Sequence, residues 1–320
     1  MNINHIKIGS RGSELAMYQS NWIKSRLEEL FPRITVEVVQ IQTTGDKILD
    51  SPLSKIGDKG LFIKEIEYAL LDRSIDLAVH SLKDIPTNLP DGLTIGAVTK
   101  REDVHDVFVA HPAQSIRTLR DVPMGSFIAT GSLRRKSQLL ALRPDLSVVE
   151  LRGNLNTRLK KLEESDWAGI ILAKAGLVRL GLQYCVSEEL SFEWMLPAVG
   201  QGALAVEIRT KDEPIQQIVQ GLNHWETEIA TSAERALLRC LEGGCQIPIG
   251  AYGRIEEGEF LLDAMIGQVE GKKIVRGTIK GFPDNAEELG THLAETLRAG
   301  GGDAILKEVR ESSVEAIPSV

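Results

Sequence analysis

Cys245 is the residue whose neighbours most favour a chemical role, because it follows two glycines in the segment from Glu234 to Gly250. Gly243 and Gly244 permit backbone conformations that other residues avoid. Pro248 fixes its own φ and biases the residue before it toward extended geometry. The pattern predicts a tight turn between a helix and a strand that presents one thiol for covalent attachment. A buried cysteine in an ordinary strand-entry turn is the simpler alternative.

A second candidate site lies at Thr130 to Arg135, which follow a predicted strand and open a predicted helix. Backbone N–H groups and the positive end of the helix dipole favour an anion there. Arg134 and Arg135 are unfavourable at such a helix end unless an anion compensates them. A guanidinium donates two parallel hydrogen bonds to a carboxylate and stays charged. Any one arginine could be an ordinary surface residue, but the set predicts an anionic ligand, and its other members are Arg152, Arg158 and Arg179.

Asp84 is a candidate acid–base residue because it follows Lys83 at the end of a predicted strand, just before Ile85 and Pro86. A carboxylate held there could stabilise a developing cation or transfer protons. Capping the turn or pairing with Lys83 is an equally simple role. His80, at the end of the same apolar run, is more typical of a hydrogen-bonded core histidine than of a ligand or base.

The composition is that of an ordinary globular chain of 320 residues, with 42% hydrophobic and 26% charged residues, enough for two or three domains. A formal net charge of −8 argues against a general nucleic-acid binder, so any anionic ligand needs a local basic cluster. Three cysteines at unrelated spacings fit neither a disulfide framework nor paired metal ligands. Without an apolar signal segment or membrane-length run, we expect a cytoplasmic protein.

The first two thirds of the chain alternate strands and helices, which predicts two α/β domains with mainly parallel sheets. The first helix should begin after Ser13 as its N-cap, and Asn156 and Thr157 are the expected caps of the helix that carries Arg158. Ligands are expected at the carboxyl ends of the strands. Strands are predicted at 6–8, 34–38, 75–79, 127–130, 148–151 and 169–172.

From Asn223 the pattern changes to a helix ending near Cys240, strands at 249–255, 260–266 and 273–280 with short glycine-containing connections, and closing helices from about Asn285. This predicts an antiparallel sheet with helices on one side. We expect three domains, with boundaries at 1–102 plus 197–221, 103–196, and 222–320. The stretch from Thr43 to Gly60 is either a lid or a disordered surface excursion.

Several motifs together resemble the hydroxymethylbilane synthase family, also called porphobilinogen deaminases. The segment around Cys245 is similar to the family's cofactor-attachment signature at nearly every position. The resemblance implies two hinged α/β domains like those of periplasmic binding proteins, plus a smaller C-terminal α+β domain. Further matching motifs, in the expected order along nearly the whole chain, are Ile8 to Ser13, Val79 to Pro86, Gly131 to Arg135, Leu151 to Asn154 and Leu196 to Gly202.

The resemblance implies a transferase that joins four porphobilinogen molecules head to tail into the linear tetrapyrrole hydroxymethylbilane, releasing ammonia at each step. A dipyrromethane cofactor would be bound to Cys245 through a thioether and would prime the chain. Lys83 and position 129 would contact this cofactor, and a buried carboxylate at Asp84 would be catalytic. The remaining family positions for carboxylate binding and hydrogen bonding fall on Arg11, Arg134, Arg135, Arg152, Arg158, Arg179, Ser13, Ser81, Thr130 and Ser132.

Two other classes of protein remain open from the sequence. Two hinged α/β domains also describe a non-catalytic binding protein for a small anionic ligand, which needs no reactive cysteine. A thiol-transfer enzyme would use Cys245 as its nucleophile, but no histidine lies in an obvious activating motif. For the transferase we expect a monomer that binds neither nucleic acid nor membranes.

Overall fold

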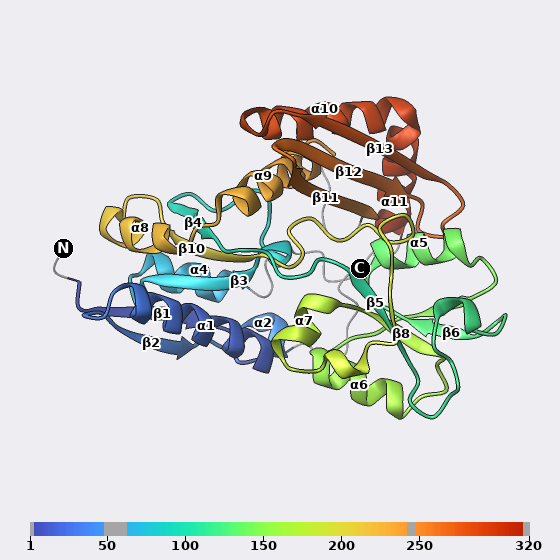
Figure 1. Ribbon diagram of the computed structural model, residues 1–320, viewed down its shortest axis with the longest axis horizontal. Helices are drawn as coiled ribbons and strands as arrows, with labels where there is room; N and C mark the ends of the chain where they lie inside the picture. Colours follow the sequence, from blue (N-terminus) through green and yellow to red (C-terminus); the bar gives the residue numbers. More distant parts are fainter. Residues whose placement is uncertain (1–2, 48–62, 242–246, 316–320) are drawn as a thin grey trace. The chain divides into compact units, whose positions relative to one another are not determined.

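The structure is a computed structural model that describes residues 3–47, 63–241 and 247–315 (Figure 1). The chain divides into two compact units. Unit 1 contains the described residues up to Glu102 together with Gly200–Glu228, and unit 2 contains Asp103–Val199 and the described residues from Ile229. The expected three-domain boundaries stay a prediction, although the structure has three separate sheets. Within the described ranges, none of the helices combines the length and apolar character that a bilayer span requires.

Unit 1 is built on a five-stranded sheet in the order β2-β1-β3-β10-β4. Ser13 is the N-cap of the first helix as expected, since its hydroxyl accepts the N–H of Ala16 at 3.3 Å. Ile23 and Leu27 of that helix are fully buried against the sheet. The elements are β1 (His5–Ser10), α1 (Glu14–Leu30), β2 (Thr35–Gln40), α2 (Thr44–Lys47), α4 (Lys64–Leu71), β3 (Leu77–Ser81), β4 (Leu93–Val98), β10 (Leu204–Arg209) and α8 (Glu213–Val219).

Unit 2 contains a second five-stranded sheet, in the order β7-β6-β8-β5-β9. Its central strands are apolar on both faces, as shown by Phe108, Ile170 and Ile171, which are 0% exposed. The elements are β5 (Asp106–Ala110), β6 (Phe127–Ala129), α5 (Leu133–Leu142), β7 (Ser147–Val149), α6 (Leu155–Glu163), β8 (Gly169–Ala173), α7 (Lys174–Arg179) and β9 (Glu188–Glu189).

Both five-stranded sheets are mainly parallel as expected, since four strands of each run in one direction, but each also contains one reversed strand that was not expected. In unit 1, β1 is parallel to β2 and β3, whereas β10 is antiparallel to β3 and β4. In unit 2, β6 is parallel to β7 and β8, whereas β5 is antiparallel to β8 and β9. The reversed strands, β5 and β10, are those by which the chain first enters unit 2 and returns to unit 1. No crossover helix precedes either strand, and such a helix is what makes successive strands parallel.

The C-terminal part of unit 2 is a three-stranded antiparallel sheet with helices α9 and α10 against its core, which confirms the smaller α+β domain. Figure 1 shows α10 lying along this sheet. Oε1 of the buried Glu234 in α9 accepts the N–H of Gly253 in β11 at 2.8 Å. The elements are α9 (Trp225–Cys240), β11 (Ile249–Glu256), β12 (Glu259–Gly267), β13 (Ile274–Gly281), α10 (Ala286–Leu297) and α11 (Asp303–Glu315).

The second face of β12 packs against α5, the helix that opens with the predicted arginine motif. A Cβ atom placed on Gly267 would lie 2.3 Å from Oγ of Ser137 in α5. Gly271, with φ +69°, lies against the backbone of α5, because a Cβ atom there would lie 2.4 Å from the nitrogen of Ala141. Close backbone contacts of this kind require glycine. They fix the arginine-bearing helix to the sheet that follows the cysteine motif.

Candidate active site

Two predicted motifs meet at one edge of the unit 1 sheet. β1 and β3 are parallel neighbours, so Arg11 and Ser13, which follow β1, lie at the same edge as the segment that follows β3. Ser81 ends β3, and Lys83 and Asp84 belong to the short 3-10 helix after it. The carboxyl ends of strands are where open α/β sheets bind ligands. The structure therefore brings these five residues to one ligand-binding edge.

Two buried glutamines contact this segment: Gln19, which the sequence patterns did not identify, and Gln201, which lies in the motif Leu196 to Gly202. Nε2 of Gln19 donates to Oγ of Ser81 at 3.0 Å, and Nζ of Lys83 donates to Oε1 of Gln201 at 3.5 Å. Their side chains are 3% and 0% exposed, respectively. Gln19 precedes Ile23 by four residues and so lies on the buried face of α1, which is the signal that could have identified it.

The side chain of Asp84 is exposed. The expectation of a buried carboxylate is therefore wrong, because the described part of the chain does not cover this side chain. In a 3-10 helix, residues three apart share one face. Leu82 and Ile85 take the inner face, with 1% and 5% exposure, and Asp84 is left on the outer side. His80 is a hydrogen-bonded core residue as predicted, since its Nε2 lies 3.0 Å from Oε2 of the buried Glu207.

The arginine-rich motifs of unit 2 follow its three parallel strands. Thr130 and Ser132 follow β6, Arg152 follows β7, and Arg179 ends the helix after β8. Ser132 caps α5 by accepting the N–H of Arg135 at 3.4 Å, and its own N–H donates to Oγ1 of Thr130 at 3.2 Å. The hydroxyl groups of Thr130 and Ser132 therefore lie at the start of α5, and Arg152 follows a neighbouring strand at the same edge of the sheet.

Position 129 is occupied by Ala129, which is 0% exposed in β6. Its methyl side chain has no polar atom, so the expected side-chain contact with a cofactor at this position is wrong. The hydroxyl groups of Thr130 and Ser132, next along the chain, are the polar side chains available at the end of this strand.

The helix that carries Arg158 begins two to three residues earlier than expected. Asn154 is the N-cap of α6, because its Oδ1 accepts the N–H of Thr157 at 2.9 Å, so the predicted caps at Asn156 and Thr157 are wrong. Nε of Arg158 donates to the carbonyl of Gly153 at 2.9 Å, and Nε of Arg152 donates to Oε1 of Glu150 at 2.8 Å. Both arginines are half-buried near the strand end.

Arg134 and Arg135 form a buried cluster with Asp106, a residue that the sequence patterns did not identify. Nη1 of Arg134 lies 2.5 Å from Oδ2 of Asp106, and Nη2 of Arg135 lies 2.7 Å from Oδ1. Burial alone would raise the pKa of Asp106, but the two guanidinium charges and their hydrogen bonds outweigh it and hold this pKa well below its usual range. The carboxylate thus stays ionised, and the three groups carry a net charge of +1.

Asp106 could have been found from the sequence, because a charged residue opens the otherwise apolar strand segment Asp106–Ala110. Carboxylates are almost never fully buried unless they are paired. The Asp106 carboxylate thus supplies part of the negative charge that was expected at the start of α5.

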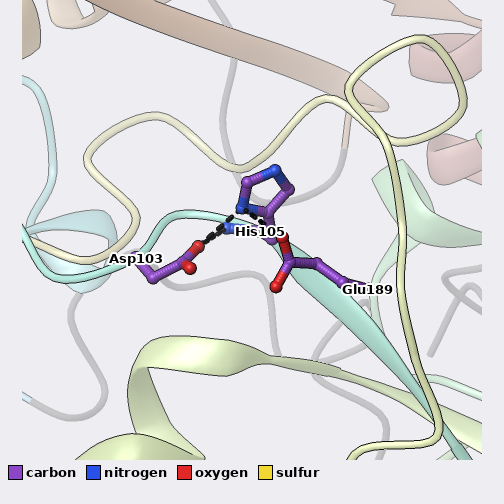
Figure 2. Close-up of side chains that lie close together, drawn as sticks. All are labelled: Asp103, His105 and Glu189. Atoms are coloured by element: carbon purple, nitrogen blue, oxygen red, sulfur yellow. Dashed lines mark hydrogen bonds and ion pairs between the residues drawn. The ribbon is translucent and has the colours of Figure 1, made fainter.

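A second charged cluster lies beside the start of β5 and is drawn in Figure 2. Nδ1 of His105 lies 2.6 Å from Oδ1 of Asp103 and 3.4 Å from Oε1 of Glu189. These three residue types could hold a metal ion, but Nζ of Lys174 lies 2.5 Å from Oδ2 of Asp103 and also contacts Glu189. The hydrogen bonds that Lys174 donates to the two carboxylates raise the pKa of its ammonium. The cation that these carboxylates bind in the structure is therefore an ammonium of the chain.

The predicted attachment turn, with Cys245, lies outside the described residues, as does most of the expected lid from Thr43 to Gly60. Leu241 and Ile247 flank the attachment turn and are both buried in the C-terminal core. Cys185 and Cys240 are half-buried free thiols.

Two family descriptions match the sequence. "Porphobilinogen deaminase, dipyromethane cofactor binding domain" matches residues 6–217, which include Asp84 and every arginine predicted to bind carboxylates. "Porphobilinogen deaminase, C-terminal domain" matches residues 229–299. The boundary between the two matches falls close to the start of α9.

Relatives of similar length carry the same name. A porphobilinogen deaminase from Chloroherpeton thalassium is 50% identical over 307 residues, covering 95% of this chain and 97% of that protein. One from Carboxydothermus hydrogenoformans is 49% identical over 308 residues, covering 96% and 98%.

Two solved structures resemble the chain only distantly. The periplasmic aliphatic sulphonate binding protein SsuA from Escherichia coli is 14% identical, with a TM-score of 0.38 over 75% of this chain and 71% of that chain. The periplasmic VFT2 domain of Bordetella pertussis BvgS is 12% identical, with a TM-score of 0.41 over 68% and 86%. Scores this low carry no argument about this chain. The two family matches and the near-full-length identity to a named relative show that the chain belongs to the porphobilinogen deaminase family.

Proposed function

We propose that this chain joins four porphobilinogen molecules head to tail, releases one ammonia at each addition, and frees the product as hydroxymethylbilane by adding one water, which supplies its hydroxyl group. The observation that carries the proposal is the 50% identity to a porphobilinogen deaminase over 95% of the chain. The motif at Cys245 supports a thioether to a dipyrromethane cofactor. A non-catalytic binding protein or a thiol-transfer enzyme would not require this whole set of motifs.

The charged residues fit such a cofactor. A dipyrromethane made from two porphobilinogen units carries two acetate and two propionate groups, and all four are anionic near neutral pH. The Arg134–Arg135–Asp106 cluster has a net charge of +1, and Arg152 and Arg158 lie at the same edge of the unit 2 sheet. When bound, the cofactor supplies the pyrrole carbon to which the first substrate unit is joined.

Asp84 is the proposed catalytic residue. The C–N bond of the protonated aminomethyl group breaks, and ammonia leaves with the bonding electron pair. The positive charge that stays on the methylene-pyrrole is stabilised by the Asp84 carboxylate. This carboxylate can also accept the proton that the attacking pyrrole carbon loses when the new C–C bond forms. Lys83, next to Asp84, provides a cation for a substrate carboxylate at the same edge.

The intact mass of the denatured protein tests this function, with Cys245→Ser as the variant and Cys240→Ser as the matched control. We expect an excess mass of two linked pyrrole units on the wild type and on Cys240→Ser, and none on Cys245→Ser. A wild-type protein without this mass would then be incubated with porphobilinogen. Failure to gain an adduct or to release ammonia would overturn the proposed function.

The finer expectations about the protein are part of the same proposal. We propose a cytoplasmic monomer that binds neither nucleic acid nor membranes. The net charge of −8 supports the absence of general nucleic-acid binding. Light scattering coupled to size-exclusion chromatography tests the monomer, and a stable dimer at micromolar concentration would contradict it.

A further inference from the structure

We propose that Asp106 is a positioning residue that sets the orientation and net charge of Arg134 and Arg135 for pyrrole carboxylates. The inference rests on the proposed function, because it takes these two arginines as carboxylate-binding groups. Asp106 itself is 0% exposed, so it acts on a ligand only through the guanidinium groups.

Each guanidinium is held by one oxygen of Asp106 and one backbone carbonyl. Nη1 of Arg134 donates to Oδ2 of Asp106 at 2.5 Å and to the carbonyl of Leu196 at 2.6 Å. Arg135 donates to Oδ1 through Nε at 3.1 Å and Nη2 at 2.7 Å, and to the carbonyl of Ile171 through Nη1 at 2.9 Å. Since a guanidinium is planar, these anchors, on Nη1 of Arg134 and on all three nitrogens of Arg135, fix the directions of the remaining N–H groups.

The charge of Asp106 matters as much as its geometry. Both arginines lie in the first turn of α5, where the helix dipole disfavours cations, and both side chains are only 6% exposed. Two buried guanidinium groups beside each other also repel. One carboxylate reduces their joint charge from +2 to +1. The cluster can therefore exist before a ligand binds and still attract an anion.

The position of Asp106 is defined by rigid elements. It is the first residue of β5, and it pairs in register with Ala173 at the end of β8. Binding groups supported by strands are held more accurately than groups supported by loops. The contact with Leu196 adds a third segment, because Gln138 of α5 also bonds both the N–H and the carbonyl of Leu196, at 2.8 and 3.1 Å.

The test uses the wild-type holoenzyme, Asp106→Asn and a matched control, Asp145→Asn. Asp145 forms a two-pronged ion pair with Arg143, just beyond the other end of α5, at 2.8 and 2.6 Å. Each substitution removes the charge of an aspartate that is paired with arginine near helix α5. Only Asp106 contacts the arginines proposed to bind the ligand. The readouts are the fraction of protein with covalent cofactor, KM and kcat for porphobilinogen in the loaded fraction, and the thermal midpoint.

For Asp106→Asn we expect a cofactor-loaded fraction lower by about 10-fold, or a KM higher by about 10- to 100-fold with a smaller change in kcat, the scale on which misplaced binding groups act. Asp145→Asn should lower the thermal midpoint without these changes. If both variants match the wild type in loading and KM, or if the two variants change them equally, Asp106 is only structural and the inference is overturned.

A second variant covers the case in which Asp106→Asn does not fold. Asp106→Glu keeps the negative charge but lengthens the side chain by one methylene, which displaces both guanidinium groups. A folded Asp106→Glu with raised KM supports the inference, and one with wild-type loading and KM overturns it. The proposed function fails by a different result, namely a wild type that neither carries the cofactor nor releases ammonia.

Discussion

Oδ2 of Asp106 lies 2.5 Å from Nη1 of Arg134, and the other carboxylate oxygen binds Arg135. The cations at the start of α5 are thus partly compensated by the chain itself. Under the proposed function, a ligand would have to meet only the remaining charge, so its binding groups would be in place before it arrives.

Acid should weaken the protein partly through Asp106. Its folded pKa lies below the unfolded value of about 4, so its contribution to stability is complete above about pH 4 and is lost as the pH falls through the folded pKa. Asp106→Asn leaves uncompensated buried cations and should cost about 3–5 kcal/mol at pH 7. Urea unfolding at pH 7 and pH 3 measures this, and the difference from wild type should shrink at pH 3. A difference equal at both pH values would contradict the ionised state assigned to Asp106.

Asp84→Asn should reduce kcat by about 100- to 1,000-fold, the scale on which a lost charge-stabilising group acts, and should leave KM within a few-fold of wild type. The reason is that its carboxylate acts on charge that develops only during loss of ammonia. Asp91→Asn, another exposed aspartate of unit 1, is the control and should keep wild-type turnover. Steady-state ammonia release measures both. Near-normal kcat in Asp84→Asn would show that this carboxylate is not catalytic.

Glu67→Gln should stabilise the protein at neutral pH. Burial, and then the like charge of Glu207, raise the pKa of Glu67, while His80 opposes the shift. A raised folded pKa means that stability is complete below the unfolded value of about 4.3 and is lost as the pH rises through the folded pKa. The urea midpoint of Glu67→Gln should therefore exceed that of wild type at pH 7 and approach it at pH 4. A lower midpoint at pH 7 would mean that the ionised carboxylate contributes a favourable interaction.

Gly271→Ala should destabilise unit 2 by about 2–5 kcal/mol, because it combines a positive φ with overlap against backbone atoms. The added methyl would lie 2.4 Å from the nitrogen of Ala141 and 2.7 Å from the carbonyl oxygen of Ser137, both in α5. Gly258→Ala is the matched control, since Gly258 also has positive φ, +86°, but no atom within 4 Å of the added methyl. Urea denaturation should show a clearly larger loss for Gly271→Ala. Equal losses would mean that α5 yields easily at this contact.

Much of the local structure followed from the sequence. The N-cap Ser13, the helix ending at Cys240 and the strands of the C-terminal sheet lie within a few residues of their predicted places. These features depend on hydrogen bonds and side-chain spacing over a few neighbouring residues, which a sequence displays directly. His80 also follows this rule, because its place on an apolar strand indicated a core residue.

Several features that the sequence did not reveal depend on the core or on partners distant in sequence. The direction of β5 and β10 depends on how the chain passes between the units, and the partner of Arg134 and Arg135 lies 28 and 29 residues away in sequence. The outward position of Asp84 depends on which neighbours the core accepts, namely Leu82 and Ile85. The sequence by itself determined the family, the motifs and the elements that carry them. Only the tertiary structure decided which charges meet, because burial and Coulomb interactions act between residues that are close in space.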